Sequence, residues 1–157
     1  MVASMVYLTK ERMIELENEL RTLKTEGRKQ MAERIATARS YGDLSENAEY
    51  DAAKEEQGLL ELNISKKEAL LANAKVVDTT SFTKDKVHIL AKVKVKNLNN
   101  NQIYDYEMVS PEEANLQSGK IAVTSPVGQA LMGRELGETV AAKVPAGLIK
   151  FEILNIE

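Results

Sequence analysis

Residues 13–23 read MIELENELRTL, and the spacing of their apolar side chains indicates how the first half of the chain folds. Four apolar positions recur at intervals of 3, 4 and 3 residues: Met13, Leu16, Leu20 and Leu23. This is the heptad pattern of a helix that packs against another helix. The pattern slips past Gly27 and then resumes, at Met31, Ile35 and Ala38.

A second seam follows, again in a segment without proline. Its positions recur at spacings of 4 and 3: Ala53, Gln57, Leu60, Ile64, Lys67, Leu71 and Ala74. Between the two seams, Gly42 is the natural place for the first helix to end. Two helices of about 30 residues would each be roughly 45 Å long, and a short connection favours antiparallel packing. So thin a hairpin buries little core, which suggests that its reach matters.

The second half of the chain has the period of two that is typical of strands. Strands are predicted over residues 87–95 (with a break near Leu90 and Ala91), 103–109, 120–125, 138–144 and 148–156. One short helix is marked by Ser125 as its cap, Pro126 in its first turn and Gly133 at its end. The expected class is α+β: a long antiparallel helical coiled-coil hairpin over residues 1–78, then an antiparallel sheet domain with one short helix over residues 79–157.

Composition limits the possible functions. The chain has 157 residues, a net charge of −3 and no cysteine. The lack of cysteine excludes disulfides and cysteine-ligated metal sites, and it fits a reducing cytoplasm. The net charge argues against a broad basic face for duplex DNA, because neutralising phosphates needs clustered lysine and arginine. No apolar run reaches the roughly 18 residues of a membrane-spanning helix.

The sequence has few of the usual catalytic signatures. Its only histidine, His88, lies in a predicted strand without a second histidine nearby, which favours a structural role. There is no Ser/His/Asp set, no phosphate-binding loop and no dinucleotide fingerprint. The chain by itself therefore does not look like an enzyme.

Carboxylates are concentrated at the expected tip of the hairpin, at Asp43, Glu46, Glu49 and Asp51. Asp43 and Glu46 are three positions apart, so if the second helix begins here their Cβ atoms lie about 5–6 Å from each other. That spacing lets both bind one hard cation such as Mg²⁺. It is also the pattern of a capping box, with Asp43 at the N-cap and Glu46 at N3. Spacing alone favours capping over metal binding.

Two basic residues, Arg39 and Lys54, flank this acidic segment. Charge alone favours their pairing in solvent with Glu46, Glu49 or Asp51. The functional alternative is a small basic patch that holds a nucleic-acid phosphate behind the acidic tip.

Two motifs carry a resemblance to a known family. Residues 38–58 read ARSYGDLSENAEYDAAKEEQG, and residues 124–133 read TSPVGQALMG. In this order and spacing they resemble the GreA/GreB transcript-cleavage factors, and the likeness extends over nearly the whole chain. The chain is more similar to the GreA branch, because its hairpin lacks an extended basic patch.

The resemblance implies a fold and a set of site residues. It implies an FKBP-like C-terminal domain that docks at the rim of the RNA polymerase secondary channel through Thr124, Ser125 and Pro126. The coiled coil would enter the channel and bring Asp43 and Glu46 to the polymerase's catalytic Mg²⁺. Arg39 and Lys54 match the family's RNA-binding patch in part. Ser45 departs from the basic residue often found between the two acidic positions.

The resemblance also implies a mechanism and partners. The two carboxylates would share Mg²⁺ only in the complex with polymerase, and the free protein would bind no metal stably. The partners are bacterial RNA polymerase and the nascent RNA 3′ end of a backtracked complex, with no membrane and no small-molecule substrate. The protein would be a cytoplasmic accessory factor rather than an enzyme. The resemblance also implies DNA binding.

Three alternatives stay open. A Gre-like inhibitor would block the channel with the same coiled coil, but the intact Gly-Asp-x-x-Glu-Asn pattern at residues 42–47 favours an activator. An FKBP-like domain could indicate a peptidyl-prolyl isomerase or chaperone, although fold does not carry function and aromatic residues are scarce. A plain coiled-coil scaffold would have no use for the acidic tip.

Overall fold

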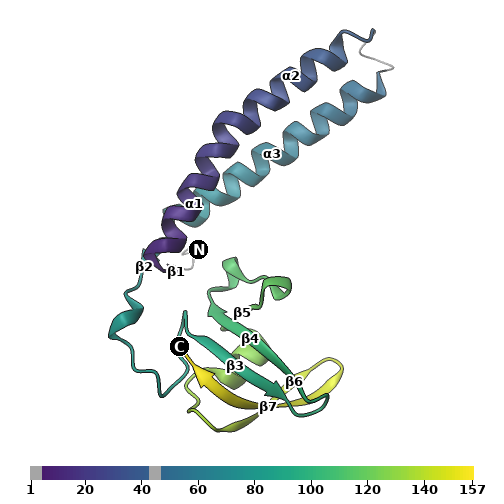
Figure 1. The fold of residues 1–157 in the computed structure, drawn as a ribbon. Helices are drawn as coiled ribbons and strands as arrows, with labels where there is room; N and C mark the ends of the chain where they lie inside the picture. The colour runs from purple at the N-terminus through teal and green to yellow at the C-terminus, as the bar shows by residue number, and fades with distance from the viewer. Residues whose placement is uncertain (1–4, 43–46) are drawn as a thin grey trace. The chain divides into compact units, whose positions relative to one another are not determined.

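The computed structural model describes residues 5–42 and 47–157, which form two units. One unit is the hairpin, Glu11–Asn73. The other contains the N-terminal segment up to Lys10 together with Ala74–Glu157. Figure 1 shows both, with the hairpin in purple to blue-green and the sheet in teal to yellow.

The hairpin has two antiparallel arms (Figure 1). The first arm is α1 (Lys10–Thr22), a π-helical segment η1 (Leu23–Gly27) and α2 (Arg28–Arg39), and the second arm is α3 (Ala48–Ala72). From Met13 to Leu71, every predicted seam position is buried or half-buried. Leu16 and Ile64 are almost fully buried, and so are Ala38 and Ala53 nearer the tip. The predicted two-seam hairpin is therefore confirmed up to Leu71. The last predicted seam position, Ala74, lies beyond α3, which ends at Ala72.

The π-helical segment η1 lies at the predicted slip in the heptad pattern. Met31 stands eight positions after Leu23, one more than a heptad. A π turn accommodates one extra residue, so Met31 still faces the second arm, with 9% of its surface exposed. Gly27, the last residue of this segment, lies close to α3. A Cβ atom added to Gly27 would be 3.3 Å from Cδ1 of Leu60.

Ion pairs connect the two arms along their length. The Arg28 guanidinium donates to both carboxylate oxygens of Glu61, at 2.9 and 3.2 Å. Further pairs across the hairpin join Arg34 to Glu56 and Lys67 to Glu19. Most of these side chains are largely exposed, so each pair contributes little to stability. Their main effect is to favour one register of the arms.

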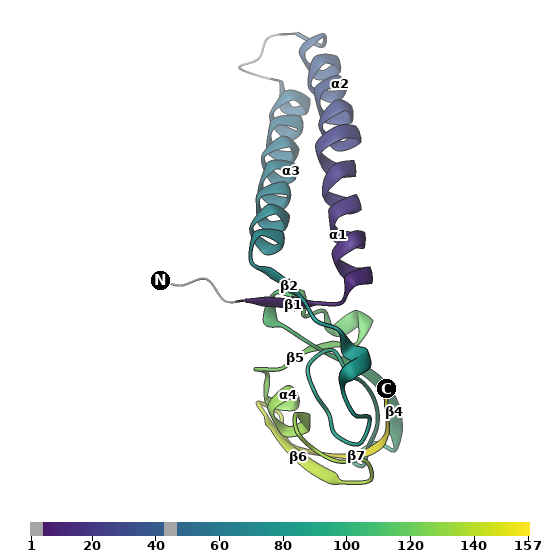
Figure 2. The same cartoon turned by 90° about the vertical axis from the view of Figure 1, so that its left-hand side faces the viewer.

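The C-terminal unit is built on a five-stranded sheet that is strongly curled (Figure 2). Its strands in spatial order are β5 (Lys120–Ala122), β4 (Gln102–Val109), β3 (Lys92–Asn97), β7 (Gly147–Ile156) and β6 (Thr139–Val144). The α+β class is confirmed, but the sheet is mixed rather than antiparallel throughout, because β4 and β5 pair in parallel. The helix α4 (Pro126–Leu131) packs against both edge strands, β5 and β6, and thereby closes the curl.

One core fills the inside of this curl. It includes buried residues from all five strands and from α4, among them Val93, Met108, Leu131, Val140 and Ile153. Since α4 contributes Leu131 to this core, the position of the turn that precedes α4 is fixed by packing of the whole unit.

The structure shortens two predicted strands. The strand predicted over residues 120–125 ends at Ala122. Residues 87–95 were expected as a strand with a break, and β3 begins only at Lys92. Leu90 has a φ of 68°, and this turn separates Val87 from the sheet ladder. Val87 instead exchanges backbone hydrogen bonds with the segment after α4, accepting from Gly133 N at 2.8 Å and donating to Arg134 O at 2.9 Å.

Two short strands were not predicted. β1 (Val6–Leu8) and β2 (Ala74–Val76) pair in parallel, and Val6 and Leu8 are almost fully buried. The amide of Tyr7 donates to Oγ of Ser110, at 3.0 Å, which ties β1 to the end of β4. Three short 3₁₀ turns complete the unit: Thr79–Ser81, Pro111–Glu113 and Leu116–Ser118.

These strands bear on the domain boundary. By its contacts, the segment up to Lys10 belongs with the C-terminal residues rather than with the hairpin. Whether residues 1–78 and 79–157 behave as separate domains stays a prediction, which fragments of the chain can test.

Candidate functional site

The N-cap of α3 is Asn47, one position beyond the predicted acidic pair. Asp43, Ser45 and Glu46 lie outside the described residues. α3 begins at Ala48, so the capping box that placed Asp43 at the N-cap is wrong for this helix. The backbone amides at the start of α3 obtain their cap from a different side chain.

Asn47 bonds to both arms of the hairpin. Its Oδ1 accepts a hydrogen bond from the amide of Tyr50 in α3, at 3.1 Å. Its Nδ2 donates to the carbonyl oxygen of Ala38 in α2, at 2.6 Å. One partner can only donate and the other can only accept, so together they fix the orientation of the amide group. Sequence reasoning missed this residue, although asparagine before a helical run is a favoured N-cap.

The first arm ends in a tight turn. The amide of Ser40 bonds to the carbonyl oxygens of Ala36 and Thr37, and the amide of Tyr41 bonds to that of Ala38, at 3.2 Å. Gly42 follows with a φ of 132°, a conformation that L side chains rarely adopt. The prediction that the helix ends before Gly42 is confirmed, with α2 ending at Arg39.

Arg39 and Lys54 come from opposite arms and are both exposed. The guanidinium carbon of Arg39 lies 5.6 Å from the centroid of the Tyr50 ring, within the range of a cation–π contact. Nζ of Lys54 donates to Oε1 of Gln57, at 2.9 Å. Within residues 5–42 and 47–157, neither cation forms an ion pair, so pairing with Glu49 or Asp51 is not observed.

Glu49 and Asp51 lie in the first turn of α3 and are exposed. Their charges are favourable there, because the N-terminus of a helix carries a partial positive charge. In the part of the chain that the structure describes, no three His, Cys, Asp or Glu side chains gather closely enough to hold a metal ion.

Thr124, Ser125 and Pro126 form the turn between β5 and α4. Oγ of Ser125 donates to Ala122 O, at 2.7 Å, and accepts from Gly128 N, at 3.1 Å. The hydroxyl group of Ser125 therefore forms its hydrogen bonds within the turn. Of the three residues, Thr124 and Pro126 are the exposed ones. The backbones approach so closely that a Cβ added to Gly128 would lie 2.0 Å from Ala122 O. The predicted docking residues therefore sit on a tightly built turn.

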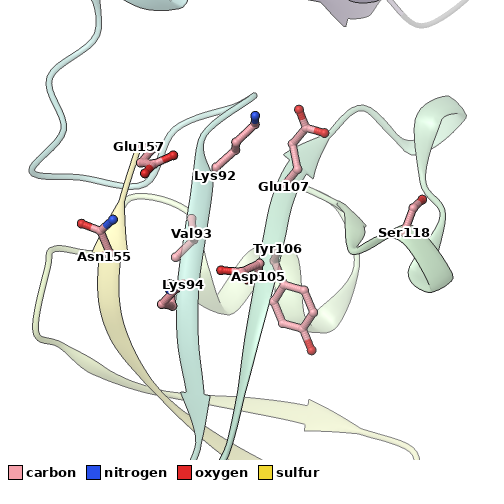
Figure 3. A pocket seen from close by; sticks show the side chains of 9 residues that line it. All are labelled: Lys92, Val93, Lys94, Asp105, Tyr106, Glu107, Ser118, Asn155 and Glu157. Carbon is pink, nitrogen blue, oxygen red and sulfur yellow. The ribbon is translucent and has the colours of Figure 1, made fainter.

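A cavity of about 350 Å³ lies on the sheet, and none of its lining residues is a predicted site residue (Figure 3). Its lining carries charges of both signs, with Lys92 and Lys94 beside Asp105 and Glu107. Burial raises the pKa of Tyr106, which also lines it. This mixture gives no preference for an anion or a cation.

His88 has structural contacts. Its ring stacks on Phe82, with the ring centroids 4.2 Å apart. Its Nδ1 lies 2.7 Å from the carbonyl oxygen of Ile89. These contacts agree with the structural role predicted for the single histidine.

None of the helices over residues 5–42 and 47–157 is both long and apolar enough to span a membrane.

Both halves of the chain match known families. Residues 6–76 match the family described as transcription elongation factor, N-terminal, and residues 82–157 match the family described as transcription elongation factor, GreA/GreB, C-term. The two matches together span most of the chain and divide it between residues 76 and 82.

Named relatives are similar over almost their full length. Transcription elongation factor GreA of Amoebophilus asiaticus is 49% identical over 150 residues, which covers 96% of each chain. The GreA of Flavobacterium psychrophilum is 46% identical over 155 residues, covering 99% of this chain and 98% of that one. Among solved structures, GreA factor homolog 1 (Gfh1) of Thermus thermophilus is 25% identical, covers 98% of this chain and 99% of that one, and has a TM-score of 0.46.

The names of these relatives concern transcription elongation, and they give no support to the expected DNA binding. Identity near one half over nearly the whole length, together with both family matches, shows that the chain belongs to the GreA/GreB family of transcription elongation factors.

Proposed function

We propose that this protein is a GreA-type factor that stimulates transcript cleavage by bacterial RNA polymerase. It binds the polymerase, inserts its hairpin into the secondary channel and promotes the polymerase's own hydrolysis of a backtracked RNA 3′ end. It is an accessory factor rather than an enzyme, and it acts in the cytoplasm with the polymerase. The observation that carries the proposal is the 49% identity to a GreA factor over 96% of both chains.

The hairpin suits this role by its length and its tip. α3 has 25 residues, which corresponds to about 38 Å at 1.5 Å per residue. The connection between the arms lies at one end of this length and carries Asp43 and Glu46. Asn47 is the N-cap of α3, so Asp43 does not hold that position. This favours a functional role for the pair.

The chemistry of the pair fits Mg²⁺, which prefers carboxylate oxygens and is commonly bound by one or two of them. Asp43 and Glu46 would be the ligands that this chain adds to the polymerase's active centre. Mg²⁺ bound there supplies charge stabilisation for the oxygens of the scissile phosphodiester. The role of the two residues is to hold negative charge at the tip where the cation is needed.

The remaining site residues are assigned by position. Arg39 and Lys54 are exposed on opposite arms beside the tip, and we assign them to the phosphates of the extruded RNA. Thr124, Ser125 and Pro126 are assigned to polymerase docking. The tight turn that holds them would give the polymerase a surface of defined shape.

The deciding experiment is RNA cleavage in backtracked complexes of the cognate polymerase, with and without the protein. We expect shortened transcripts and renewed elongation at saturating protein. Inhibition of both cleavage and elongation would instead identify a factor that only blocks the channel. Unchanged cleavage despite polymerase binding would contradict the proposed activity.

A further inference from the structure

The geometry points to Tyr50 as a positioning residue, whose ring holds the guanidinium of Arg39 where it can bind a phosphate of the extruded RNA. This inference rests on the proposed function, because it presupposes that Arg39 contacts RNA. It adds an uncharged residue to the basic flank of the hairpin.

The first step is that the arginines of α2 have different partners on α3. Each of them contacts a residue across the hairpin, in antiparallel order: Arg28 with Glu61, Arg34 with Glu56 and Arg39 with Tyr50. Two of the three partners are carboxylates, and the third is a tyrosine. Arg39 therefore crosses the hairpin as the other two arginines do, but it meets an aromatic ring in place of a negative charge.

The second step is that the hairpin fixes the ring of Tyr50. Tyr50 is half-buried in the first turn of α3 and packs against the core cluster of Met31, Ala38 and Ala53, which includes residues of both arms. Its amide donates to Oδ1 of Asn47, at 3.1 Å. Side chain and backbone are both anchored, so the ring offers a fixed surface to a long side chain beside it.

The third step is that the ring limits where the Arg39 guanidinium lies. Arg39 is the last residue of α2 and is exposed, and an exposed arginine has many rotamers available. Its guanidinium carbon lies over the Tyr50 ring, 5.6 Å from the centroid. Arg39 forms no ion pair within residues 5–42 and 47–157. The cation–π contact favours one position of the guanidinium, so less freedom is lost when a phosphate binds.

The fourth step is that this contact leaves Arg39 able to bind a phosphate. A carboxylate partner, such as Glu61 for Arg28, accepts hydrogen bonds from the guanidinium and offsets its charge. An aromatic face attracts the cation through its quadrupole and carries no net charge. The guanidinium keeps its positive charge and its planar fork of N–H donors, which matches a phosphate bidentately. Tyr50 therefore orders Arg39 without neutralising it.

The experiment compares Tyr50→Leu and Tyr50→Phe with wild type in backtracked complexes whose RNA carries a photoreactive nucleotide at its extruded 3′ end. Leucine keeps an apolar side chain and removes the aromatic face, whereas phenylalanine keeps the face. We expect Tyr50→Leu to lower RNA crosslinking, and cleavage at subsaturating protein, by about two- to fivefold, the range of an exposed cation–π contact. Tyr50→Phe should crosslink as well as wild type.

A matched control is Ile35→Val, because Ile35 is half-buried against the same core cluster as Tyr50. This variant loosens the packing of the cluster and keeps the aromatic face, so crosslinking should equal that of wild type. A loss as large as that of Tyr50→Leu would show that packing rather than the ring matters, and it would overturn the inference.

A double-mutant cycle shows whether Tyr50 acts through Arg39. In the Arg39→Ala background, Tyr50→Leu should cause no further loss of crosslinking, because the side chain that the ring positions is already missing. An equal loss in both backgrounds would show that Tyr50 contacts the RNA by itself, and the positioning role would be wrong.

The free protein gives a reading that does not depend on activity. Protons over an aromatic face are shifted upfield by the ring current, so the side-chain NMR signals of Arg39 should lie upfield in wild type and in Tyr50→Phe relative to Tyr50→Leu. The signals of Arg28, whose partner is Glu61, are an internal control and should not move. Identical Arg39 signals in all three proteins would contradict the contact.

Arg39→Ala separates this inference from the proposed function. If Arg39→Ala loses crosslinking while Tyr50→Leu keeps it, only the positioning role fails. If Arg39→Ala crosslinks as wild type does, the RNA contact assigned to Arg39 fails, and the inference fails with it. If the wild-type protein crosslinks to RNA without stimulating cleavage, the proposed activity fails while the crosslinking comparison still decides the role of Tyr50.

Discussion

At the scale of single residues, the start of α3 shows which of two candidate side chains is its N-cap, a choice that the sequence alone does not decide. Asp43 and Asn47 are both good N-cap residues, and each stands before a plausible helical run. The choice depends on a bond from Asn47 to Ala38 on the other arm. No local pattern contains that contact, so the sequence could predict an acidic tip but not its cap.

The acidic pair gives the first prediction. Asp43→Asn and Glu46→Gln should each lower stimulated cleavage by roughly tenfold or more, because about 1.4 kcal/mol of lost stabilisation is a factor of ten in rate. Removing the carboxylate charge should act on the cleavage rate while binding to polymerase stays the same. Thermal melting is the control, and we expect no change because Asn47 caps the helix. Wild-type rates in both variants would contradict the metal-binding assignment.

The basic flank gives the second prediction. Arg39→Ala combined with Lys54→Ala should weaken crosslinking to the extruded RNA and lower cleavage severalfold, with less difference from wild type as salt rises, because exposed charges are screened. The double variant Lys29→Ala with Lys66→Ala removes the same charge from exposed positions elsewhere on the hairpin. Equal losses in the two double variants would show that only net charge matters.

At the scale of elements, the seams were predictable because a long helix repeats its contacts every few residues. The strands β1 and β2 have three residues each, too few to show a period, and β2 follows directly on a helical seam. The late start of β3 was also hidden, since it depends on hydrogen bonds between Val87 and the segment after α4. Local patterns predict long elements well and miss those that only tertiary contacts define.

Two glycines in the hairpin give the third prediction. Gly58 lies within α3, and a Cβ added there would meet no atom within 4 Å. Gly58→Ala should therefore stabilise the hairpin by about 0.5–1 kcal/mol, the usual cost of glycine in a helix. Gly27→Ala should stabilise less, because its Cβ would press on Leu60. Urea unfolding of both variants measures the difference, and a destabilised Gly58→Ala would contradict the observed open space.

The turn before α4 gives the fourth prediction. Gly128→Ala would place a Cβ 2.0 Å from Ala122 O, so the backbone must move. We expect a loss of more than about 1 kcal/mol in the free energy of unfolding, as for other overpacked sites. Because the same turn holds Ser125 and Pro126, polymerase affinity should fall too. Gln129→Ala, at an exposed position one residue further on, is the control and should change neither quantity.

At the scale of the whole molecule, the fifth prediction concerns the division of labour between the two units. Residues 79–157 alone should bind polymerase but fail to stimulate cleavage, because the acidic tip is missing. A pull-down with this fragment and with residues 1–78 measures both affinities. Tight binding by residues 1–78 and none by the other fragment would reverse the assignment.

The fragment should also be less stable than the same unit in the full chain. It lacks β1, whose Val6 and Leu8 are almost fully buried and whose Tyr7 bonds to Ser110. Residues 79–157 joined to residues 5–10 through a flexible linker should recover part of that loss. No recovery would show that β1 adds little to the unit.

The π-helical segment η1 keeps the two halves of the first arm in the same angular register. A regular helix turns by about 100° per residue, so one additional residue rotates everything beyond it by that angle. The inward stripe continues through α2 only because η1 absorbs this rotation. The solvent-facing sides of α1 and α2 therefore stay aligned as well. A partner surface that runs along the outside of the first arm would meet one continuous face from α1 to α2.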